Sequence, residues 1–294
     1  MVAGSCGLRW SDMKKYYSFA GVEVEIDIPA PWMYENERHL APFGVTSVED
    51  PYVFQFELVE QIMPPKSECV FRSSGMQVYA DGVRYHGSVA ESWDMAYAQI
   101  LRSGRHHRVL LDKSQCPGKV GVSAVLTALS AEHLVAQNHG FVFHSSYIDV
   151  DGKAILFTAP SGTGKSTQAD LWQKHRDARI INGDRSAVRW VNDGAYACGI
   201  PFSGSSTYCE NVTLPLAAIV YLKQAPQTTI RRVKGSEAFR KVWEGCSVNT
   251  WDRDDVDMVS ETVIQVLSAV PVYELACTPD ESAIIALEGV LPHE

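Results

Sequence analysis

The sequence has no Cys-x-x-Cys pair and no apolar run approaching the roughly 18 residues that a membrane-spanning helix requires. Its seven cysteines are widely spaced and odd in number, which favours buried thiols in a reducing compartment over a disulfide framework or a zinc knot. Residues 1–17 lack the charged start, apolar block and cleavage site of a secretory signal. We therefore expect a soluble, cytoplasmic protein with no membrane partner.

Positive charge is also scarce, since 26 Lys and Arg stand against 35 Asp and Glu, which gives a net charge of −9. Bulk neutralisation of nucleic-acid phosphates requires the opposite balance, so a nucleic-acid partner is not expected and any anionic ligand must be bound locally. The length of 294 residues is enough for about two domains, and 46% apolar residues are enough for a buried core. The oligomeric state stays open, a homo-oligomer being one alternative.

The first part of the chain has the pattern of short strands. Residues 22–28 and 53–58 alternate apolar and polar side chains, which is typical of half-buried strands. Residues 80–83, Ala-Asp-Gly-Val, predict a hairpin turn. We expect a small β-rich domain over residues 1–113, whose role the sequence does not indicate.

A second domain is expected over residues 114–294, beginning with the polar stretch 114–119 and one buried helix over 120–137. Asp151-Gly152 between two apolar runs predicts a two-residue hairpin turn, because both positions of such a turn need φ above zero. Further strand pairs are predicted at 186–191 with 195–200 and at 216–222 with 228–233. Helices are predicted at 165–175, 236–244, 252–269 and 280–287, with Ser236, Asp252 and Asp280 as N-caps or first-turn anions.

The most informative segment is 159–167, Ala-Pro-Ser-Gly-Thr-Gly-Lys-Ser-Thr, which fits the nucleotide-binding P-loop with Ala in place of the first Gly. Small residues let consecutive backbone N–H groups turn toward a phosphate, the lysine reaches the β and γ oxygens, and the following serine offers its hydroxyl to Mg²⁺. The expected nucleotide-binding residues are Ala159, Ser161, Gly162, Thr163, Gly164, Lys165, Ser166 and Thr167. A plain glycine-rich turn with a solvated lysine is the alternative.

The Asp151-Gly152 turn also places a histidine beside this loop. If those two residues form the turn, the numbers of cross-strand partners sum to 303, and His144 lies opposite Ala159. An imidazole next to nucleotide phosphates can act in proton transfer. The alternative is a half-buried histidine that only binds a neighbouring strand.

A P-loop also needs a carboxylate that completes the magnesium shell at the end of a neighbouring strand. Asp184 is the candidate, and Arg185 beside it could stabilise charge on a transferred phosphoryl group. The alternatives are a turn at Asn182-Gly183 and a surface ion pair of Arg185. The later Gly/Ser stretch 199–206 could line an acceptor site or serve as a connector, and its candidate residues are Ser203, Gly204 and Ser205.

Together, Phe143-His144-Ser145-Ser146, the P-loop, Asn182-Gly183-Asp184-Arg185 and residues 199–205 resemble the C-terminal kinase domain of HPr kinase/phosphorylase. That bacterial enzyme phosphorylates a serine of the phosphocarrier protein HPr, and its nucleotide fold is similar to that of phosphoenolpyruvate carboxykinase. The resemblance covers about residues 139–225 and is strongest for the shorter HPr-kinase-related proteins. It departs at three places. The family has two adjacent aspartates, of which the first is the general base, and this chain has Gly183 there. The family's long signature segment is not found downstream of that pair, and the N-terminal 110 residues do not match the N-terminal domain of the HPr enzyme.

The resemblance implies an α/β fold with a mixed-sheet P-loop kinase domain after the β-rich N-terminal domain. It implies an ATP-dependent phosphotransferase that uses Mg²⁺, with a hydroxyl-bearing peptide, protein or small molecule as acceptor. Catalytic roles then fall to His144, Lys165, Asp184 and Arg185, and metal binding falls to Ser166 and Asp184. Because Gly183 replaces a carboxylate, the alternative is an ATP-binding regulatory or assembly module with a degenerate kinase site.

Overall fold

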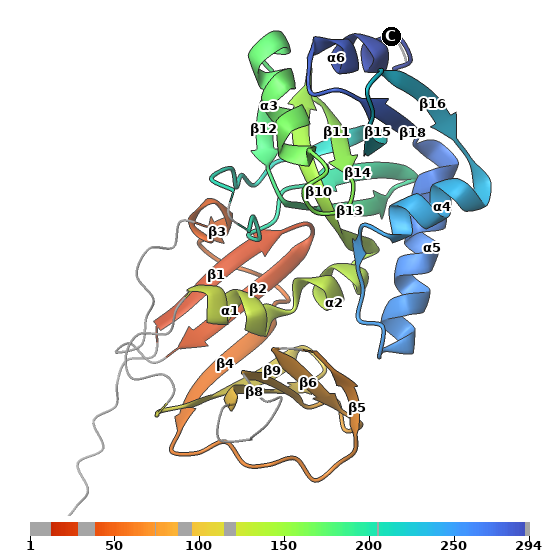
Figure 1. Cartoon of the computed structure of the whole chain (residues 1–294). Helices are drawn as coiled ribbons and strands as arrows, with labels where there is room; N and C mark the ends of the chain where they lie inside the picture. Colours follow the sequence, from red (N-terminus) through yellow and green to blue (C-terminus); the bar gives the residue numbers. More distant parts are fainter. Residues whose placement is uncertain are drawn as a thin grey trace, which may run out of the picture. The chain divides into compact units, whose positions relative to one another are not determined.

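The computed structural model describes the chain in six segments, residues 13–28, 39–73, 75–87, 96–114, 122–204 and 206–291. It is an α/β protein with two mixed sheets (Figure 1). The chain divides into two compact units. Unit 1 contains residues 1–18, 23–37 and 44–129, and unit 2 contains residues 19–22, 38–43 and 130–294. The division near the middle of the chain therefore falls at 129/130, whereas the sequence pattern placed a domain boundary at 113/114.

Unit 1 is built mainly of strands. In the described segments they form a nine-stranded sheet in the order β3-β1-β2-β4-β9-β8-β7-β6-β5. The strands are β1 (Met13–Phe19), β2 (Val22–Ile28), β3 (Gly44–Val45), β4 (Tyr52–Val59), β5 (Cys69–Arg72), β6 (Met76–Tyr79), β7 (Arg84–Gly87), β8 (Ala96–Ser103) and β9 (His106–Asp112). A 3-10 helix, η2 (Ala41–Phe43), and the helix α1 (Val122–Leu129) complete the described elements up to residue 129.

The alternating sequence patterns in this part form the strands that they predict. Side chains of β2 are buried at every second position, and β4 begins with the same alternation. The predicted hairpin turn is confirmed as well, because β6 and β7 pair antiparallel around residues 80–83, with Gly82 at φ 78°.

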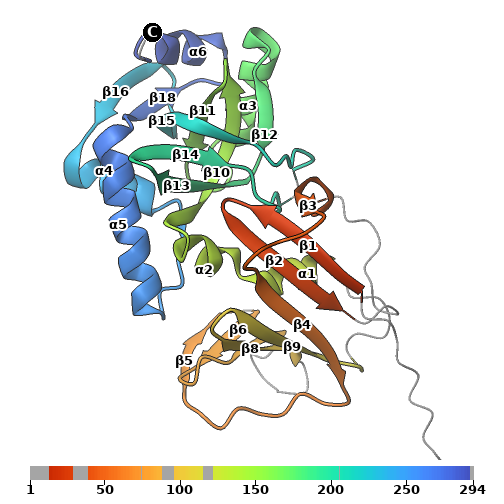
Figure 2. The ribbon, with the colours of Figure 1, turned by 180° about the vertical axis from the view of Figure 1, so that it is seen from behind.

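Unit 2 contains a second nine-stranded sheet in its described residues, which Figure 2 shows from behind. Its path is β11-β10-β13-β14-β15-β18-β16, and β12 and β17 also pair with β10. The strands are β10 (Gly140–Val150), β11 (Lys153–Thr158), β12 (Arg179–Asn182), β13 (Arg185–Val191), β14 (Gly194–Cys198), β15 (Thr213–Gln224), β16 (Thr229–Val233), β17 (Cys246–Ser247) and β18 (Val272–Cys277).

Two predicted hairpins are confirmed in this sheet. β10 pairs with β11 in the register that sums to 303, from Ser145↔Thr158 to Val150↔Lys153, and Asp151 and Gly152 have φ of 50° and 78°. β13 pairs with β14 around Asn192 and Asp193, whose φ values are also positive. Both turns therefore have the backbone that a two-residue hairpin requires.

Helices pack against two separate hydrophobic cores of this sheet. One core receives buried residues of α2 (Ala131–Ala136), α4 (Gly235–Trp243) and α5 (Arg253–Ala269). The other receives residues of α3 (Lys165–Arg176) and α6 (Glu281–Glu288), with the fully buried Trp172 among them. The helices α3, α5 and α6 agree with the predicted ranges within one residue at each end, and Asp252 and Asp280 cap α5 and α6 as expected. No helix of the described segments combines the length and the apolar character that crossing a bilayer demands.

Three expectations about local structure were wrong. The single helix predicted over 120–137 is two helices, because Ser130 adopts a left-handed conformation with φ 51° between α1 and α2; residues 120 and 121 lie outside the described segments. β15 and β16 do not pair with each other, since β18 lies between them. Ser236 is not an N-cap, because α4 already begins at Gly235 after Lys234.

Candidate active site

The candidate site lies where three parallel strands end. β11, β15 and β18 run in the same direction, and their last paired residues include Thr158↔Tyr221 and Gln224↔Cys277. β12 pairs antiparallel with β10, as β11 does, so its carboxyl end is at the same edge. Ligands of open α/β sheets commonly bind at this edge, where loops leave the strands. The P-loop follows β11, and Gly183 and Asp184 follow β12.

The P-loop has the backbone that anion binding requires. Gly162 and Gly164 have φ of 78° and 116°, a backbone conformation that residues other than glycine rarely adopt. The helix α3 begins directly after Gly164, so its positive end faces the loop. Among the described residues, no hydrogen-bond partner contacts the backbone amides of Gly162, Gly164, Lys165, Ser166 and Thr167. These amides are available to an anion, and the segment is the strand–loop–helix that the sequence predicted.

Lys165 is buried within this loop. Its ammonium group donates to the carbonyl oxygen of Ala159 at 3.0 Å and to that of Pro160 at 3.5 Å. Burial lowers the pKa of Lys165, and the nearby Asp184 carboxylate acts in the opposite direction. Two weak carbonyl partners for a buried cation leave its charge poorly neutralised, so an anion in the loop would gain a strong partner.

The predicted partners His144, Asp184 and Arg185 come together beside the loop. Nε2 of His144 lies 3.3 Å from Oδ1 of Asp184, and Nε of Arg185 lies 3.5 Å from the other carboxylate oxygen. The strand β10 fixes this pairing, because Ser145 N donates to the Asp184 carbonyl oxygen at 3.1 Å. The side chains are about one-third to one-half exposed, so a ligand can reach them.

The surroundings of His144 favour its neutral form. Burial lowers the pKa of His144 below 6.5, the positive charges of Lys165 and Arg185 lower it further, and Asp184 acts in the opposite direction. A neutral imidazole near pH 7 can accept a proton, whereas an imidazolium cannot. The same coupling shows that Lys165 and His144 are electrostatic neighbours, as the hairpin register predicts.

Asn182, which the sequence pattern indicates only as part of a turn, is the residue that positions Asp184. Its Oδ1 accepts hydrogen bonds from the backbone N–H of Asp184 and of Arg185, both at 3.0 Å. Its Nδ2 donates to the carbonyl oxygens of Ile200 and Phe202, and the side chain is fully buried. The Asn-Gly turn and the functional role of Asp184 are therefore compatible, since the turn aims the carboxylate at His144. The sequence signal for this role is an Asn two residues before the Asp, since an Asn side chain commonly accepts a hydrogen bond from the backbone two residues on.

The Gly/Ser loop reaches the same carboxylate. A Cβ atom on Gly204, which has φ 53°, would lie 2.8 Å from Oδ2 of Asp184. Ser203, by contrast, is buried, and its hydroxyl is 2.8 Å from Nδ1 of His39. Its side chain thus serves the packing of the loop. Ser205, the third residue expected there, lies outside the described residues.

A serine fills the space beside Gly183. A Cβ atom on Gly183 would lie 2.4 Å from Oγ and 2.9 Å from Cβ of Ser206. The carbonyl oxygen of Gly183 is 3.5 Å from Oγ of Ser166, the hydroxyl expected to bind Mg²⁺, and 3.0 Å from Oγ of Ser146. The glycine is required here by a tertiary contact, and the carboxylate that the resemblance would place at 183 has no room.

A cavity of about 600 Å³ adjoins the other side of the P-loop. The residues lining it come from the loop and the first turn of α3, from the end of β15 and the residues after it (Leu222–Pro226), and from the end of β18 and the residues after it (Cys277–Pro279). Gln224 links these parts, because its Nε2 contacts the carbonyl oxygens of Gly162 and Thr163 at 3.5 and 3.4 Å. A nucleoside attached to phosphates in the loop would have room in this cavity.

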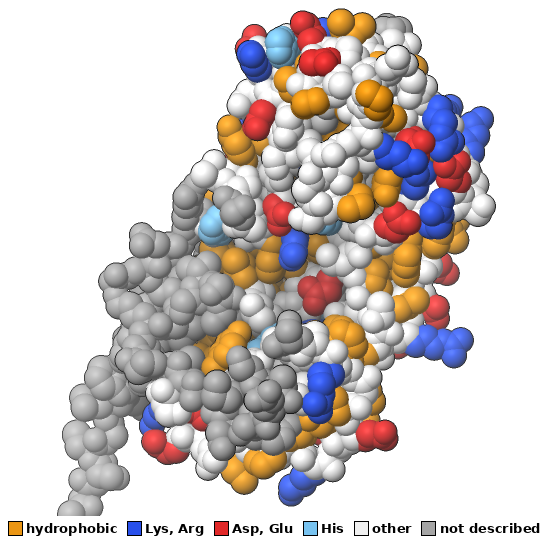
Figure 3. Space-filling view, in the orientation of Figure 1, with side chains coloured by type: hydrophobic (Ala, Val, Ile, Leu, Met, Phe, Trp, Pro, Cys, Tyr) orange, Lys and Arg blue, Asp and Glu red, His pale blue; other side chains and the backbone are white. Residues whose placement is uncertain are grey.

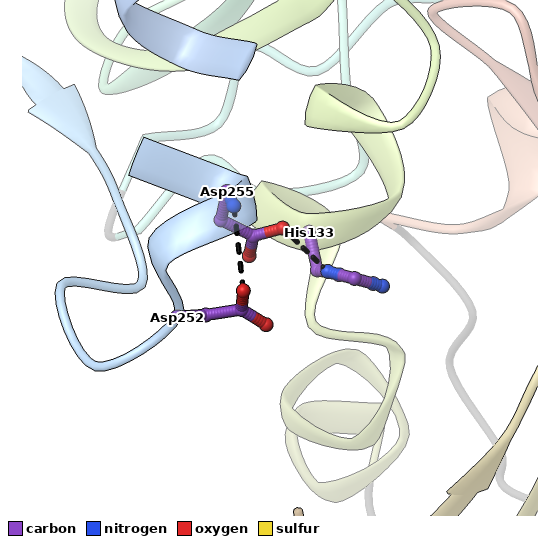
Figure 4. A group of neighbouring side chains, drawn as sticks. All are labelled: His133, Asp252 and Asp255. Atoms are coloured by element: carbon purple, nitrogen blue, oxygen red, sulfur yellow. Dashed lines mark hydrogen bonds and ion pairs between the residues drawn. The ribbon is translucent and has the colours of Figure 1, made fainter. Parts of the chain in front are cut away.

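Away from this site, His133, Asp252 and Asp255 form a cluster with metal-ligand chemistry (Figure 4). Asp252 caps α5 through the amides of Asp254 and Asp255, and Asp255 contacts Nδ1 of His133 at 2.7 Å. Asn249 donates to the second oxygen of Asp255. The other ring nitrogen of His133 points away from both carboxylates (Figure 4). The contacts are those of a helix cap and a tie between α2 and α5.

No family model matches the sequence, and no curated protein matches it. Among solved structures, the chain is similar to the Hpr(Ser) kinase/phosphatase from Coxiella burnetii, with a TM-score of 0.30 and 9% sequence identity. The match covers 50% of this chain and 94% of that chain. A likeness this weak carries no information about activity, so the proposal that follows rests on the residues of the site.

Proposed function

We propose that this protein is an ATP-dependent kinase that transfers the γ-phosphoryl group to a hydroxyl, either of a peptide or protein serine or of a small alcohol. The observation that carries the proposal is the P-loop, with amides that are unpaired among the described residues and a buried, weakly partnered Lys165, next to the His144–Asp184 pair. Phosphoryl transfer needs positioning and neutralisation of phosphate charge more than covalent chemistry, and this arrangement offers both.

The residues present fit a magnesium ion. Ser166 supplies a hydroxyl oxygen and Asp184 a carboxylate oxygen, the hard ligands that Mg²⁺ prefers. The turn at Gly183, whose carbonyl oxygen lies 3.5 Å from the Ser166 hydroxyl, brings the two together. When bound, the ion neutralises negative charge on the β and γ phosphates.

The proton of the acceptor hydroxyl can go to His144. Its neutral ring accepts the proton, and Asp184 beside Nε2 stabilises the cation that forms. The acceptor oxygen forms a bond to the γ-phosphorus while the bond to the β–γ bridging oxygen breaks and ADP leaves. Arg185, on the other side of the carboxylate, adds a positive charge near the transferred group.

Gly183 favours a second candidate function. In the kinases that this sequence resembles, a carboxylate at that position is the general base, and here Ser206 occupies the space. A nucleotide-binding module that changes conformation with ATP and transfers no phosphate would need the P-loop and Lys165 alone. Product formation separates the two: a kinase consumes ATP steadily only when an acceptor is present.

The decisive experiment is calorimetric titration of the full-length protein with ATP and Mg²⁺. Replacement of Lys165 by Ala removes charge-assisted hydrogen bonds to phosphate of about 2 kcal/mol, so affinity should fall about thirtyfold. Lys174→Ala is the matched control, because Lys174 is an exposed lysine near the other end of the same helix. The proposal fails if the folded wild type gives no heat of binding, or if both variants bind ATP equally well.

A further inference from the structure

The hydroxyl of Ser206 lies within the proposed kinase site and has no role in the mechanism described. Its oxygen lies 2.4 Å from the position that a Cβ atom on Gly183 would take, and the carbonyl oxygen of the same glycine contacts Ser166 of the P-loop. Gly183 alone thus lies between Ser206 and the Ser166 hydroxyl, which is expected at the metal and the γ-phosphate.

The backbone fixes Ser206 in this position. Ser206 N donates to the carbonyl oxygen of Ser203 at 2.8 Å, and the Ser203 hydroxyl contacts the Ser206 carbonyl oxygen at 3.3 Å. Gly204 belongs to the same turn, and a Cβ atom on it would lie 2.8 Å from Oδ2 of Asp184. The turn that carries the serine therefore touches the residue proposed to bind metal and to support proton transfer.

The Ser206 hydroxyl retains its own proton for donation. Oγ accepts a hydrogen bond from Tyr208 N at 3.1 Å, and within the described residues it donates to no acceptor. The hydroxyls of Ser146 and Ser203, which are close in the fold, are both engaged, with the Gly183 carbonyl oxygen and with His39. A hydroxyl that only accepts a hydrogen bond can give its proton to a nearby base.

We infer that Ser206 is a self-phosphorylation site of this protein. The inference rests on the proposed function. The oxygen of Ser206 forms a bond to the γ-phosphorus of ATP held in the same molecule, the bond to the β–γ bridging oxygen breaks, ADP leaves, and the serine proton passes to the His144–Asp184 pair. Arg185 is the cation beside that carboxylate and faces the charge of the product.

The glycine at 183 and the serine at 206 together determine which chemical group occupies this part of the site. A glycine at 183 makes room for a hydroxyl that comes from a distant loop, so a nucleophile stands where a side chain of residue 183 would be. The protein can then serve as its own acceptor whenever ATP is bound and no other acceptor is present.

The test incubates full-length protein with ATP and Mg²⁺ in the absence of any acceptor, followed by intact mass measurement and mapping of the modified peptide. Four proteins are compared: wild type, Ser206→Ala, Lys165→Ala and the control Ser268→Ala, an exposed serine of α5. ATP binding by each is measured calorimetrically. We expect wild type and Ser268→Ala to gain one phosphoryl group on Ser206, at a rate independent of protein concentration, and the other two variants to gain none there.

The binding measurement distinguishes the two possible failures. If wild type does not bind ATP, the proposed function is wrong and this inference falls with it. If wild type binds ATP and phosphorylates an added acceptor, yet Ser206 stays unmodified, the inference alone is wrong. Modification of another residue, an unchanged mass gain in Ser206→Ala, or a rate that rises with protein concentration also overturns it.

Discussion

Replacing Gly183 by Ala tests the packing on which the site depends. The backbone itself should accept alanine, because Gly183 is absent from the residues with positive φ. The added Cβ would nevertheless lie 2.4 Å from Oγ and 2.9 Å from Cβ of Ser206. Rotation of the serine hydroxyl relieves the first contact only. The second remains, and it requires the turn at residues 203–206 to move.

The size of the effect follows from these contacts. Rotating the hydroxyl breaks its hydrogen bond from Tyr208 N, which is worth about 1 kcal/mol. Shifting a well-packed turn by a few tenths of an ångström costs about another 1 kcal/mol, within the range for overpacking. The free energy of unfolding of Gly183→Ala should therefore fall by about 2 kcal/mol.

Urea unfolding of the full-length protein, followed by fluorescence, measures this change in the free energy of unfolding. Gly289→Ala is the matched control, because a Cβ there meets nothing closer than 3.5 Å and φ is −65°. Adding Ser206→Gly to Gly183→Ala removes both clashing atoms, so the two substitutions should couple favourably by about 1–2 kcal/mol. Purely additive effects, or a Gly183→Ala variant as stable as Gly289→Ala, would refute the steric reasoning.

Three further predictions concern charge and space in unit 2. Burial acts to raise the pKa of Glu274, but hydrogen bonds from Lys241, Lys223 and Arg231 reverse this and hold it at about 2. Glu274→Gln removes the nearest carboxylate of the buried Lys241, so unfolding experiments at pH 7 should show a loss of about 3 kcal/mol. This deficit should shrink as the pH falls from 4.5 toward 2, because the carboxyl group of the unfolded wild type binds a proton in that range while the folded carboxylate stays ionised. The pKa of His144 lies below 6.5 in the folded state. As the pH falls below 6.5, wild type should therefore lose stability relative to His144→Gln, because the histidine binds the proton more readily in the unfolded chain. Parallel pH profiles of stability for the two proteins would contradict this. Ala225→Trp should fill part of the cavity of about 600 Å³, weakening ATP binding by about tenfold or more while inorganic tripolyphosphate binds as before. Equal losses for both ligands would show that the nucleoside does not occupy this cavity.

The features that the sequence predicted well are governed by neighbours along the chain. The confirmed strand–loop–helix was predicted from small residues, a lysine and a serine at fixed spacing, and all lie within residues 159–167. The Asp151-Gly152 turn determines the register of both strands that leave it, and this put His144 next to the loop correctly.

Surface charge pairs show what such patterns leave open. Around α4, acidic and basic side chains lie side by side, as Figure 3 shows on one face of the molecule, and Arg231 pairs with both Glu237 and Glu274. The pair with Glu274 depends on β16 lying next to β18, and local patterns do not indicate this, because α4 and α5 separate the two strands along the chain. The expected pairing of β15 with β16 failed for the same reason.

The departures at single residues also have tertiary causes. The apolar spacing of residues 120–137 satisfies one helix, yet Ser130 turns left-handed there, and nothing in its own sequence neighbourhood requires this. The contact of Gly183 with Ser206 joins two loops, so the space that a side chain at 183 would need is filled by a residue distant in sequence. Asn182 was visible in the sequence, whereas its two carbonyl partners were not.

The strand β10 has a consequence for how this chain can vary. Its first half pairs with β13 and β17, and its second half with β11 and β12. Inserting or deleting one residue within it would reverse the faces of its side chains and move His144 away from Asp184 while disturbing four partner strands. Length changes should be tolerated instead at the exposed turns around Asp151 and Asp193, which are suitable places to insert a fluorescent reporter.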